Sequence, residues 1–362
     1  RGVAMAQLSP AMRALVQPHL VDIEPYDPKF TPTSINLSAN ENTYPLPAGV
    51  RDAIDAALAS TPLNRYPDPL SGELRAELAR WHGLEPEQVC VGNGGDELLF
   101  NVLLAFGGRG RALVTCPPDF SEYAFFASLV ETETLSVARD PESFAPRVDD
   151  LVRAAQTANL VIVTSPNNPT GDLFPLDAVE RLCDACPGIV LVDEAYGEFA
   201  KESMLAYLDT YHNLYVTRTL SKAYGFAGAR LGFLISCPSN IAKLKPVLVP
   251  YNISSLTQRA GVIVLRHAAE YELLVEEIQL ERDMLYHKLK QLKNVTFYPS
   301  QANYLYGRSS YKQELLKAME KEGIVIRNYE GKDSFRITVG SPAENAIVLS
   351  VLQEFDRKAV AV

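Results

Sequence analysis

A lysine in a segment rich in glycine and alanine is the first group in this sequence that could do chemistry. Lys222 follows Ser221 in the run TLSKAYGFAGARLGF, and Arg230 comes eight positions later. The small residues let the backbone approach a flat ligand, while the hydroxyl and the guanidinium offer two donors to a phosphate. A buried lysine near positive charge has a free amine near neutral pH and bonds covalently to an aldehyde. On its own, however, a serine–lysine pair is typical of an ordinary exposed lysine.

A glycine-rich turn offers a second candidate site. The run GNGGDE follows the short apolar segment QVCV and leads into LLFNVLLAF, which predicts a strand, a turn and a helix. Backbone amides at Gly94 and Gly95 would bind an anion at the helix N-terminus, aided by the helix dipole. Asp96 and Glu97 stand where the third glycine of a dinucleotide fingerprint would lie, and no P-loop lysine follows. The turn is a candidate phosphate site, with an unliganded turn as the alternative.

Three more polar side chains follow apolar segments of strand length. Asn168 lies in SPNNPTG, and Asp193 and Tyr196 lie in DEAYGEF. A carboxylate keeps the nitrogen of a pyridoxal ring protonated so that the ring withdraws electrons, while a phenol and an amide bond the ring oxygen. Phe120, in PPDFSEY, is a candidate to stack on the ring face. A helix cap or a turn explains each residue separately, but their order along the chain together with Lys222 favours a pyridoxal phosphate site.

Alternating strand and helix patterns between residues 88 and 236 must position these groups. The strand segments are apolar without period-two alternation, which predicts a largely parallel sheet covered by helices on both faces. Ligands of such sheets bind at the carboxyl ends of the strands. Gly95, Asn168 and Asp193 each follow a strand segment, so the pattern brings them together.

The chain is long enough for two domains. Residues 1–40 contain several prolines and no long periodic segment, so we expect an arm that is ordered only against the small domain and a partner subunit. We assign residues 41–250 to a large domain and 251–362 to a small C-terminal domain. An amphipathic helix over 255–293 is expected to join the two.

Composition bears on the class of partner and on the compartment. The 362 residues include 34 lysines and arginines against 44 aspartates and glutamates, a net charge of −10, which argues against a nucleic-acid or membrane surface. No apolar run approaches the roughly 18 residues of a membrane span, and no signal peptide pattern opens the sequence. Cys183 and Cys186 form a C-x-x-C without a second pair or nearby histidines, so we expect no metal site. These features favour a cytoplasmic protein with small-molecule substrates.

The motifs GNGGDE, SPNNPTG, DEAYGEF, TLSKAYGFAGARLGF and SFRITVG together resemble those of fold-type I pyridoxal-phosphate aminotransferases, most closely the histidinol-phosphate aminotransferases. The resemblance extends over residues 20–360. It implies an α/β fold with a large domain, in which a mainly parallel mixed sheet lies between helices, and a smaller α+β C-terminal domain. It also implies pyridoxal 5′-phosphate as the cofactor.

The resemblance assigns roles to residues at the cofactor. Lys222 is implied to be the Schiff-base lysine and proton shuttle, Asp193 the partner of the pyridine nitrogen, and Tyr196 a donor to the ring oxygen. The other implied cofactor contacts are Asn168, Phe120, Gly94, Gly95, Ser221 and Arg230. Tyr66, in NRYPDPLS, is implied to reach the cofactor phosphate of a neighbouring subunit, so a homodimer is expected.

Substrate contacts are implied at four positions. Arg336, in FRITVG, resembles the arginine that makes a bidentate bond to a substrate α-carboxylate, a geometry that lysine does not copy. Arg327, in IVIRN, is a candidate for the distal phosphate of the substrate, with a surface arginine at a strand end as the alternative. Tyr26 and Asn42 complete the set. The arm segment YDPKF keeps Tyr26 but lacks a glycine that is common in the family.

The implied reaction is a ping-pong transamination through Lys222 between L-histidinol phosphate and 2-oxoglutarate. Two other enzyme classes share these motifs: the aromatic amino-acid aminotransferases and threonine-phosphate decarboxylase. A phosphate-binding module without catalysis would retain GNGGDE but leave Lys222, Asp193 and Arg336 unexplained.

Overall fold

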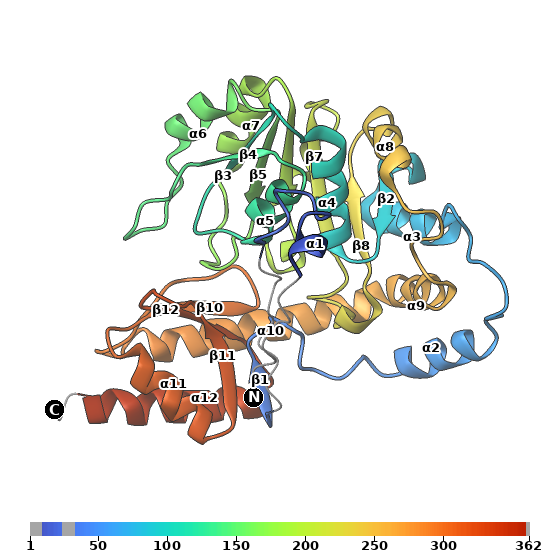
Figure 1. Cartoon of the computed structure of the whole chain (residues 1–362). Coiled ribbons are helices and arrows are strands. Elements are labelled where there is room, and N and C mark those ends of the chain that lie inside the picture. The colour runs from blue at the N-terminus through green and yellow to red at the C-terminus, as the bar shows by residue number, and fades with distance from the viewer. Residues whose placement is uncertain (1–8, 24–32, 360–362) are drawn as a thin grey trace.

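Two sheets, each covered by helices, organise the chain in a computed structural model that describes residues 9–23 and 33–359 (Figure 1). In Figure 1 the larger sheet lies above the smaller one, which occupies the lower left of the molecule. A short helix, α1 (Pro10–Arg13), precedes both sheets in the chain. Within the described ranges, no helix is both long enough and apolar enough to cross a membrane.

The larger sheet has seven strands in the order β2-β8-β7-β6-β5-β3-β4. Neighbouring strands from β7 to β4 are parallel, whereas β8 is antiparallel to both β7 and β2. The strands are β2 (Val89–Gly92), β3 (Ala112–Thr115), β4 (Glu133–Ser136), β5 (Leu160–Thr164), β6 (Ile189–Asp193), β7 (Leu214–Thr219) and β8 (Gly232–Ile235). The predicted mainly parallel, mixed sheet is confirmed.

Both faces of the larger sheet are buried, because successive side chains of a strand point to opposite faces. In β5, Leu160 and Ile162 belong to one hydrophobic core, while Val161 and Val163 belong to another. The first core is completed by α4 (Gly95–Phe106), α5 (Glu122–Leu129) and α8 (Pro238–Leu244). The second is completed by α2 (Val50–Ala59), α3 (Gly72–His82), α6 (Val148–Ala155), α7 (Leu176–Ala185) and α9 (Ser255–Arg266). The continuous apolar strands of the sequence therefore reflect a sheet between two helical layers.

Short 3-10 helices connect several of these elements. They are η1 (Pro86–Gln88), η2 (Gly197–Phe199), η3 (Met204–Tyr207), η4 (Ala227–Ala229) and η5 (Lys245–Val247). Two of them, η2 and η4, follow the carboxyl ends of β6 and β7 and so lie in the motifs DEAYGEF and TLSKAYGFAGARLGF. The segment around Lys222 is therefore irregular, as its glycine and alanine content predicts.

The smaller sheet has five strands in the order β1-β11-β12-β10-β9. Its first strand, β1 (Ile35–Leu37), comes from the N-terminal region and is parallel to β11 (Ile324–Asn328). The remaining strands are antiparallel to their neighbours: β9 (Thr296–Phe297), β10 (Tyr304–Arg308) and β12 (Ser334–Thr338). The helices α11 (Lys312–Lys321) and α12 (Pro342–Ala359) share a third hydrophobic core with this sheet.

A long helix, α10 (Ala268–Leu289), links the two cores. Tyr271 and Ile278 pack into a core of the larger sheet, whereas Leu285 and Leu289 pack into that of the smaller one. The helical segment predicted over 255–293 is divided at His267, whose backbone leaves helical geometry, into α9 and α10. Because α9 packs against α2 and α3, we propose that the boundary between the domains falls within α10 rather than at residue 250.

Candidate active site

A cavity of about 720 Å³ lies between the larger and the smaller sheet. Its lining includes Thr164, Asp193 and Thr219, the last residues of β5, β6 and β7. The smaller sheet contributes Arg327 and Arg336. The carboxyl ends of parallel strands are where ligands of open α/β sheets bind, so the cavity is the candidate active site.

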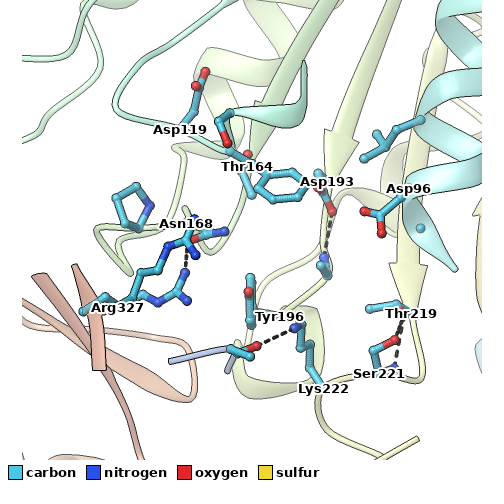
Figure 2. Close-up of a pocket in the computed structure, with 18 of the residues that line it drawn as sticks. Asp96, Asp119, Thr164, Asn168, Asp193, Tyr196, Thr219, Ser221, Lys222 and Arg327 are labelled. Atoms are coloured by element: carbon cyan, nitrogen blue, oxygen red, sulfur yellow. Dashed lines mark hydrogen bonds between the residues drawn. The ribbon is translucent and has the colours of Figure 1, made fainter. Parts of the chain in front are cut away.

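Lys222 projects into this cavity from the segment after β7 (Figure 2). Its Nζ donates a hydrogen bond of 3.0 Å to the carbonyl oxygen of Ala39 and lies 5.8 Å from the centre of the Tyr196 ring. Burial, together with the nearby charge of Arg336, lowers the pKa of Lys222 to about 8. More of its amine is therefore unprotonated near neutral pH than in an ordinary lysine.

Asp193 ends β6 and is 5% exposed. Its Oδ1 accepts a hydrogen bond of 3.0 Å from the amide of Ala195, and its Oδ2 accepts one of 2.6 Å from the hydroxyl of Tyr123. The same hydroxyl lies 2.7 Å from Oγ1 of Thr164. Burial raises the pKa of Asp193 to about 6, while the bond from Tyr123 opposes that rise. Asp193 is therefore held in one orientation and is charged at neutral pH.

Tyr196 and Asn168 contact residues from the opposite side of the cavity. The Tyr196 hydroxyl accepts a hydrogen bond of 2.8 Å from Nδ2 of Asn40, and burial raises the pKa of the phenol. Oδ1 of Asn168 accepts a hydrogen bond from Nη1 of Arg336. The second nitrogen of that guanidinium, Nη2, donates 2.7 Å to the carbonyl oxygen of Ser38. The segment 38–40 thus bonds the phenol and the arginine, and the arginine in turn bonds the amide.

Gly94, Gly95, Ser221 and Arg230 form what we call the phosphate cradle. Gly94 is the N-cap of α4 with a φ of 90°, and a Cβ there would lie 2.5 Å from Nη2 of Arg230. That nitrogen also donates 3.2 Å to Oδ2 of Asp96. Because glycine leaves this space open, a helix N-terminus, a hydroxyl and a guanidinium converge in an arrangement suited to a phosphate dianion. In Figure 2, Asp96 lies on the side of the cavity opposite Arg327.

The remaining predicted site residues are more dispersed. Phe120 and Arg327 line the cavity. Asn42 instead donates a hydrogen bond of 3.0 Å to the carbonyl oxygen of Ala223, next to Lys222. Tyr66 is 81% exposed and stacks on Tyr251, with ring centres 4.6 Å apart, outside the cavity lining. Tyr26 lies outside the described residues.

Sequence reasoning missed Tyr123 and Asn40, which orient Asp193 and Tyr196. Tyr123 occurs in PPDFSEY, three residues after Phe120, and Asn40 occurs in LSANENTYP. A tyrosine on a helix and an asparagine among turn formers carry no local signal of their partners. Asp96 was noted only as a departure from a dinucleotide motif, and it pairs with Arg230.

The C-x-x-C pair lies in the core of the larger domain. Cys183 belongs to α7 and Cys186 is its C-cap, and both are buried free thiols. Burial raises the pKa of Cys183 to about 12, which keeps that thiol protonated. Among the described residues, no group of three or more histidines, cysteines, aspartates and glutamates is arranged to hold a metal ion.

The model of the family "Aminotransferase class I and II" matches residues 32–352. The chain belongs to this family. Among its curated relatives is the histidinol-phosphate aminotransferase of Thermobifida fusca (strain YX), 38% identical over 335 residues that cover 90% of each chain. Others that carry the same name are 32% and 36% identical over more than nine-tenths of this chain. The resemblance predicted from the motifs is confirmed.

Solved structures of an aminotransferase and of a decarboxylase have the same fold. The histidinol-phosphate aminotransferase from Sinorhizobium meliloti, in complex with pyridoxal-5′-phosphate, has a TM-score of 0.82 at 24% identity, over 90% of this chain and 92% of that one. L-threonine-O-3-phosphate decarboxylase from Porphyromonas gingivalis has a TM-score of 0.75 at 25% identity, over 89% of this chain and 99% of that one. Since the fold serves both reactions, the substrate has to be argued from the site.

Proposed function

We propose that this aminotransferase-family chain binds pyridoxal 5′-phosphate and exchanges the amino group between L-histidinol phosphate and 2-oxoglutarate, as a cytoplasmic homodimer. The observation that carries the chemistry is the convergence of Lys222, Asp193 and the phosphate cradle on one cavity. The shared name of the curated relatives supports the choice of substrate.

The residues of the cavity fit the proposed cofactor. The space that a Cβ at Gly94 would fill lies beside Arg230, where a phosphate finds helix amides and a guanidinium. Each oxygen of the Asp193 carboxylate accepts one hydrogen bond, which fixes its orientation. A carboxylate held in this way suits the protonated nitrogen of a pyridine ring. When bound, pyridoxal phosphate supplies an electron sink for the carbanion formed at the substrate Cα.

The residues of this chain then hold and move protons around that ring. With the cofactor bound, the amine of Lys222 would take the proton from the substrate Cα and hold it for return to the reacting centre. Its lowered pKa, about 8, makes the free amine accessible near neutral pH. Asp193 would keep the ring nitrogen protonated, and Tyr196 and Asn168 would donate to the ring oxygen. Asn42 acts through the segment that carries Lys222 rather than on the substrate, because it bonds the carbonyl of Ala223.

Two arginines of the smaller sheet suit the anionic groups of the proposed substrates. The buried guanidinium of Arg336 is oriented by Ser38 and by Oδ1 of Asn168, and a substrate carboxylate would replace Asn168 as its acceptor, while the donor of Asn168 toward the cofactor is its Nδ2. Arg327 lines the same cavity, as does Lys332, and both carry positive charge. We assign Arg336 to the α-carboxylate of glutamate and 2-oxoglutarate, and Arg327, with Tyr26, to the phosphate of histidinol phosphate.

An exposed apolar surface supports the homodimer. Leu63, Tyr66 and Leu70 are exposed on one segment, and Val249 and Tyr251 on another, and the two segments meet where Tyr66 stacks on Tyr251. A surface of this kind suits a second copy of the chain. We assign Tyr66 to the cofactor phosphate of the neighbouring subunit, because in this subunit it stands away from the cavity.

A substrate panel with product analysis tests the proposal. Purified protein is supplied with pyridoxal phosphate, 2-oxoglutarate and either L-histidinol phosphate, L-phenylalanine or L-threonine phosphate, and glutamate and CO2 are measured. We expect glutamate at the highest kcat/KM with histidinol phosphate, and none with Lys222→Ala, in which borohydride no longer attaches the cofactor to the protein. Preference for phenylalanine would support an aromatic aminotransferase instead, and CO2 from threonine phosphate a decarboxylase. A protein without a visible cofactor band would be a binding module.

A further inference from the structure

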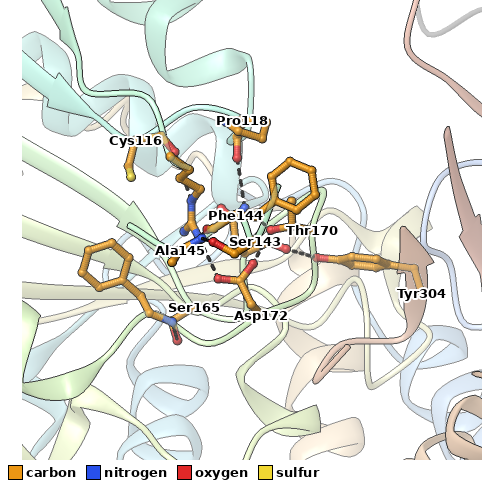
Figure 3. A network of polar contacts seen from close by, with 12 residues as sticks. Cys116, Pro118, Ser143, Phe144, Ala145, Ser165, Thr170, Asp172 and Tyr304 are labelled. Atoms are coloured by element: carbon orange, nitrogen blue, oxygen red, sulfur yellow. Dashed lines mark hydrogen bonds and ion pairs between the residues drawn. The ribbon is translucent and has the colours of Figure 1, made fainter. Parts of the chain in front are cut away.

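A buried arginine outside the cavity lining connects two loops that reach into the cavity. Arg139 follows β4 and is 3% exposed. Its Nη1 donates 2.6 Å to Oδ2 of Asp172 and 2.9 Å to the carbonyl oxygen of Phe144, and its Nε donates 3.2 Å to the carbonyl oxygen of Cys116. Cys116 lies in a first loop, which follows β3, and Asp172 lies in a second loop, which follows β5. Figure 3 shows Asp172 and Thr170 between Cys116 and Tyr304.

The first of these loops, residues 116–120, carries Phe120 into the cavity. It has little regular structure and is held by polar bonds at successive positions. Besides the bond to Cys116, the amide of Arg139 donates 2.8 Å to the carbonyl oxygen of Pro117. The carbonyl of Pro118 accepts 3.0 Å from Nδ2 of Asn167, in the second loop. Arg139 therefore holds the start of the loop whose end carries Phe120.

The second loop, residues 165–172, carries Asn168 into the cavity. Asp172 accepts a bond from Arg139 at one oxygen and from the Thr170 hydroxyl at the other. That hydroxyl accepts 2.6 Å from Nδ2 of Asn167, the neighbour of Asn168. A chain of hydrogen bonds thus runs from Arg139 through Asp172 and Thr170 to Asn167, the neighbour of Asn168.

The smaller domain holds the other side of this second loop. The Tyr304 hydroxyl donates 2.6 Å to the carbonyl oxygen of Asn167, and the amide of Gln301 donates 2.7 Å to that of Gly171. On the side of the larger sheet, the bond between Arg139 and Asp172 holds the loop in the corresponding way. A buried arginine–carboxylate pair is weak grounds for a role in stability, because desolvation offsets much of the attraction, but its directional bonds suit the positioning of two loops.

We propose that Arg139 and Asp172 are positioning residues of the aminotransferase site. They keep the loop that carries Phe120 and the loop that carries Asn168 at a fixed distance from each other around the cofactor ring. The pair acts through Phe120 and Asn168. This inference rests on the proposed function, in which one of these residues stacks on the ring and the other donates to the ring oxygen.

The test compares Arg139→Met with Asn168→Ala and with the double variant. The measured quantities are the dissociation constant of pyridoxal phosphate and the pH midpoint of its visible absorption band in the protein. We expect Arg139→Met to weaken cofactor binding about tenfold, the loss of roughly one charge-assisted hydrogen bond. The pH midpoint of the absorption band should rise, because a misplaced side-chain amide of Asn168 no longer favours negative charge on the ring oxygen. In the Asn168→Ala background, Arg139→Met should shift the midpoint by much less.

Two further variants separate positioning from folding. Arg139→Lys keeps the charge but not the fork of donors, and Asp172→Asn keeps the shape but not the charge, so each should reproduce part of the midpoint shift. Arg75→Met is the matched control. Arg75 also donates to two backbone carbonyl oxygens, from Nε to Val89 and from Nη2 to Pro86, but these carbonyls lie outside the cavity lining. Arg75→Met should lower the melting temperature without moving the midpoint.

A purely structural role for Arg139 would have a different signature. The melting temperature would fall in Arg139→Met while cofactor affinity and midpoint stayed at wild-type values, or the shift would be undiminished in the Asn168→Ala background. Either result overturns the inference. Both readouts need only protein and pyridoxal phosphate, so a failure of the protein to use histidinol phosphate would refute the proposed substrate and leave this comparison decisive.

Discussion

The hydroxyl of Tyr123 donates a hydrogen bond of 2.6 Å to Oδ2 of Asp193 across the carboxyl end of the larger sheet. Both side chains are buried, and burial alone would favour the neutral acid. The tyrosine therefore helps to keep a charge on a carboxylate that has little contact with water. A phenylalanine at position 123 would preserve the packing and remove this donor.

We expect Tyr123→Phe to narrow the pH range of activity from the acidic side. The pKa of Asp193 is about 6 with the donor present, and loss of the donor raises it further, so the charged form requires a higher pH. The acidic limb of kcat/KM should move upward, with a larger loss at pH 6 than at pH 8. Tyr215→Phe is the control, because Tyr215 is a buried tyrosine of β7 that donates 3.4 Å to the carbonyl of Asn240. Superimposable acidic limbs in wild type and Tyr123→Phe would contradict the role of the donor.

Capture of pyridoxal phosphate by the cofactor-free protein should depend on the pKa of Lys222. Only the unprotonated amine attacks the aldehyde, so the rate should rise with pH and level off above about 8 rather than near the ordinary lysine value of 10.5. Arg336→Met removes a positive charge that lowers this pKa, and its midpoint should therefore lie at higher pH. Stopped-flow absorbance measures the rates. A wild-type midpoint near 10 would mean that the cavity does not free the amine.

The glycine at position 94 should be required for cofactor affinity. In Gly94→Ala the new Cβ would displace the guanidinium of Arg230 from the phosphate cradle, in addition to straining a backbone of positive φ. Gly83→Ala also adds a Cβ at a positive φ, 66°, with no atom within 4 Å, but in the αL region, where the backbone strain is smaller than at Gly94. Equilibrium titration with pyridoxal phosphate should show a clear loss of affinity for the first variant only. Equal losses would indicate that strain, and not displacement of Arg230, weakens binding.

The two cavity arginines should differ in the substrates that they affect. A hydrogen bond from arginine to phosphate contributes roughly 1.5–3 kcal/mol. Arg327→Ala should therefore lower kcat/KM for histidinol phosphate by about one to two decades and leave phenylalanine nearly unchanged. Arg336→Ala should impair every substrate with an α-carboxylate, glutamate included. Steady-state kinetics on both substrates decide the matter, and parallel losses in Arg327→Ala would exclude phosphate recognition by this arginine.

Mixed dimers test whether Tyr66 serves a neighbouring site. Lys222→Ala subunits and Tyr66→Phe subunits should each have low activity alone. In a hybrid dimer one site would collect both defects and the other would be intact, so activity should increase on mixing towards about one quarter of wild type for random exchange of equal amounts. Subunit exchange is verified with differently tagged chains. A mixture that exchanges subunits without regaining activity would indicate that each site is built from one chain.

Local patterns were sufficient to predict that Asp193 and Asn168 lie at one edge of the sheet, because both come directly at or after the ends of apolar strands. Asp193 ends β6, and Asn168 follows β5 by a few residues, so strand order alone brings both to one edge of the sheet. Their hydrogen-bond partners could not be predicted in this way. Tyr123 is 70 residues from Asp193, and Asn40 is 156 residues from Tyr196. Such contacts depend on how helices and loops pack, which the composition of a motif does not specify.

The break in the helical segment was also beyond local pattern. The periodicity of residues 255–293 is helical throughout, so it does not reveal that His267 interrupts it or that the first helix packs on α2. The same holds for β1, three residues long, which is a strand because β11 offers an edge for it. The role of Tyr66 stays a prediction, since the resemblance implies a contact with the cofactor phosphate of a neighbouring subunit, and within one subunit Tyr66 stacks on Tyr251.

The pairing of β1 with β11 has a consequence for the synthesis of this enzyme on the ribosome. Residues 35–37 leave the ribosome almost 300 residues before their partner strand, and Asn40 bonds Thr338, 298 positions later. The last strand of the larger sheet, β8, ends at Ile235, so all strands of that sheet have been synthesised long before β11. The wall of the cavity formed by residues 38–40 lacks its supporting strands until residues 324–338 have been synthesised. A nascent chain therefore acquires Lys222 and the phosphate cradle early, but completes the cavity only when residues 324–338 have folded against residues 35–40.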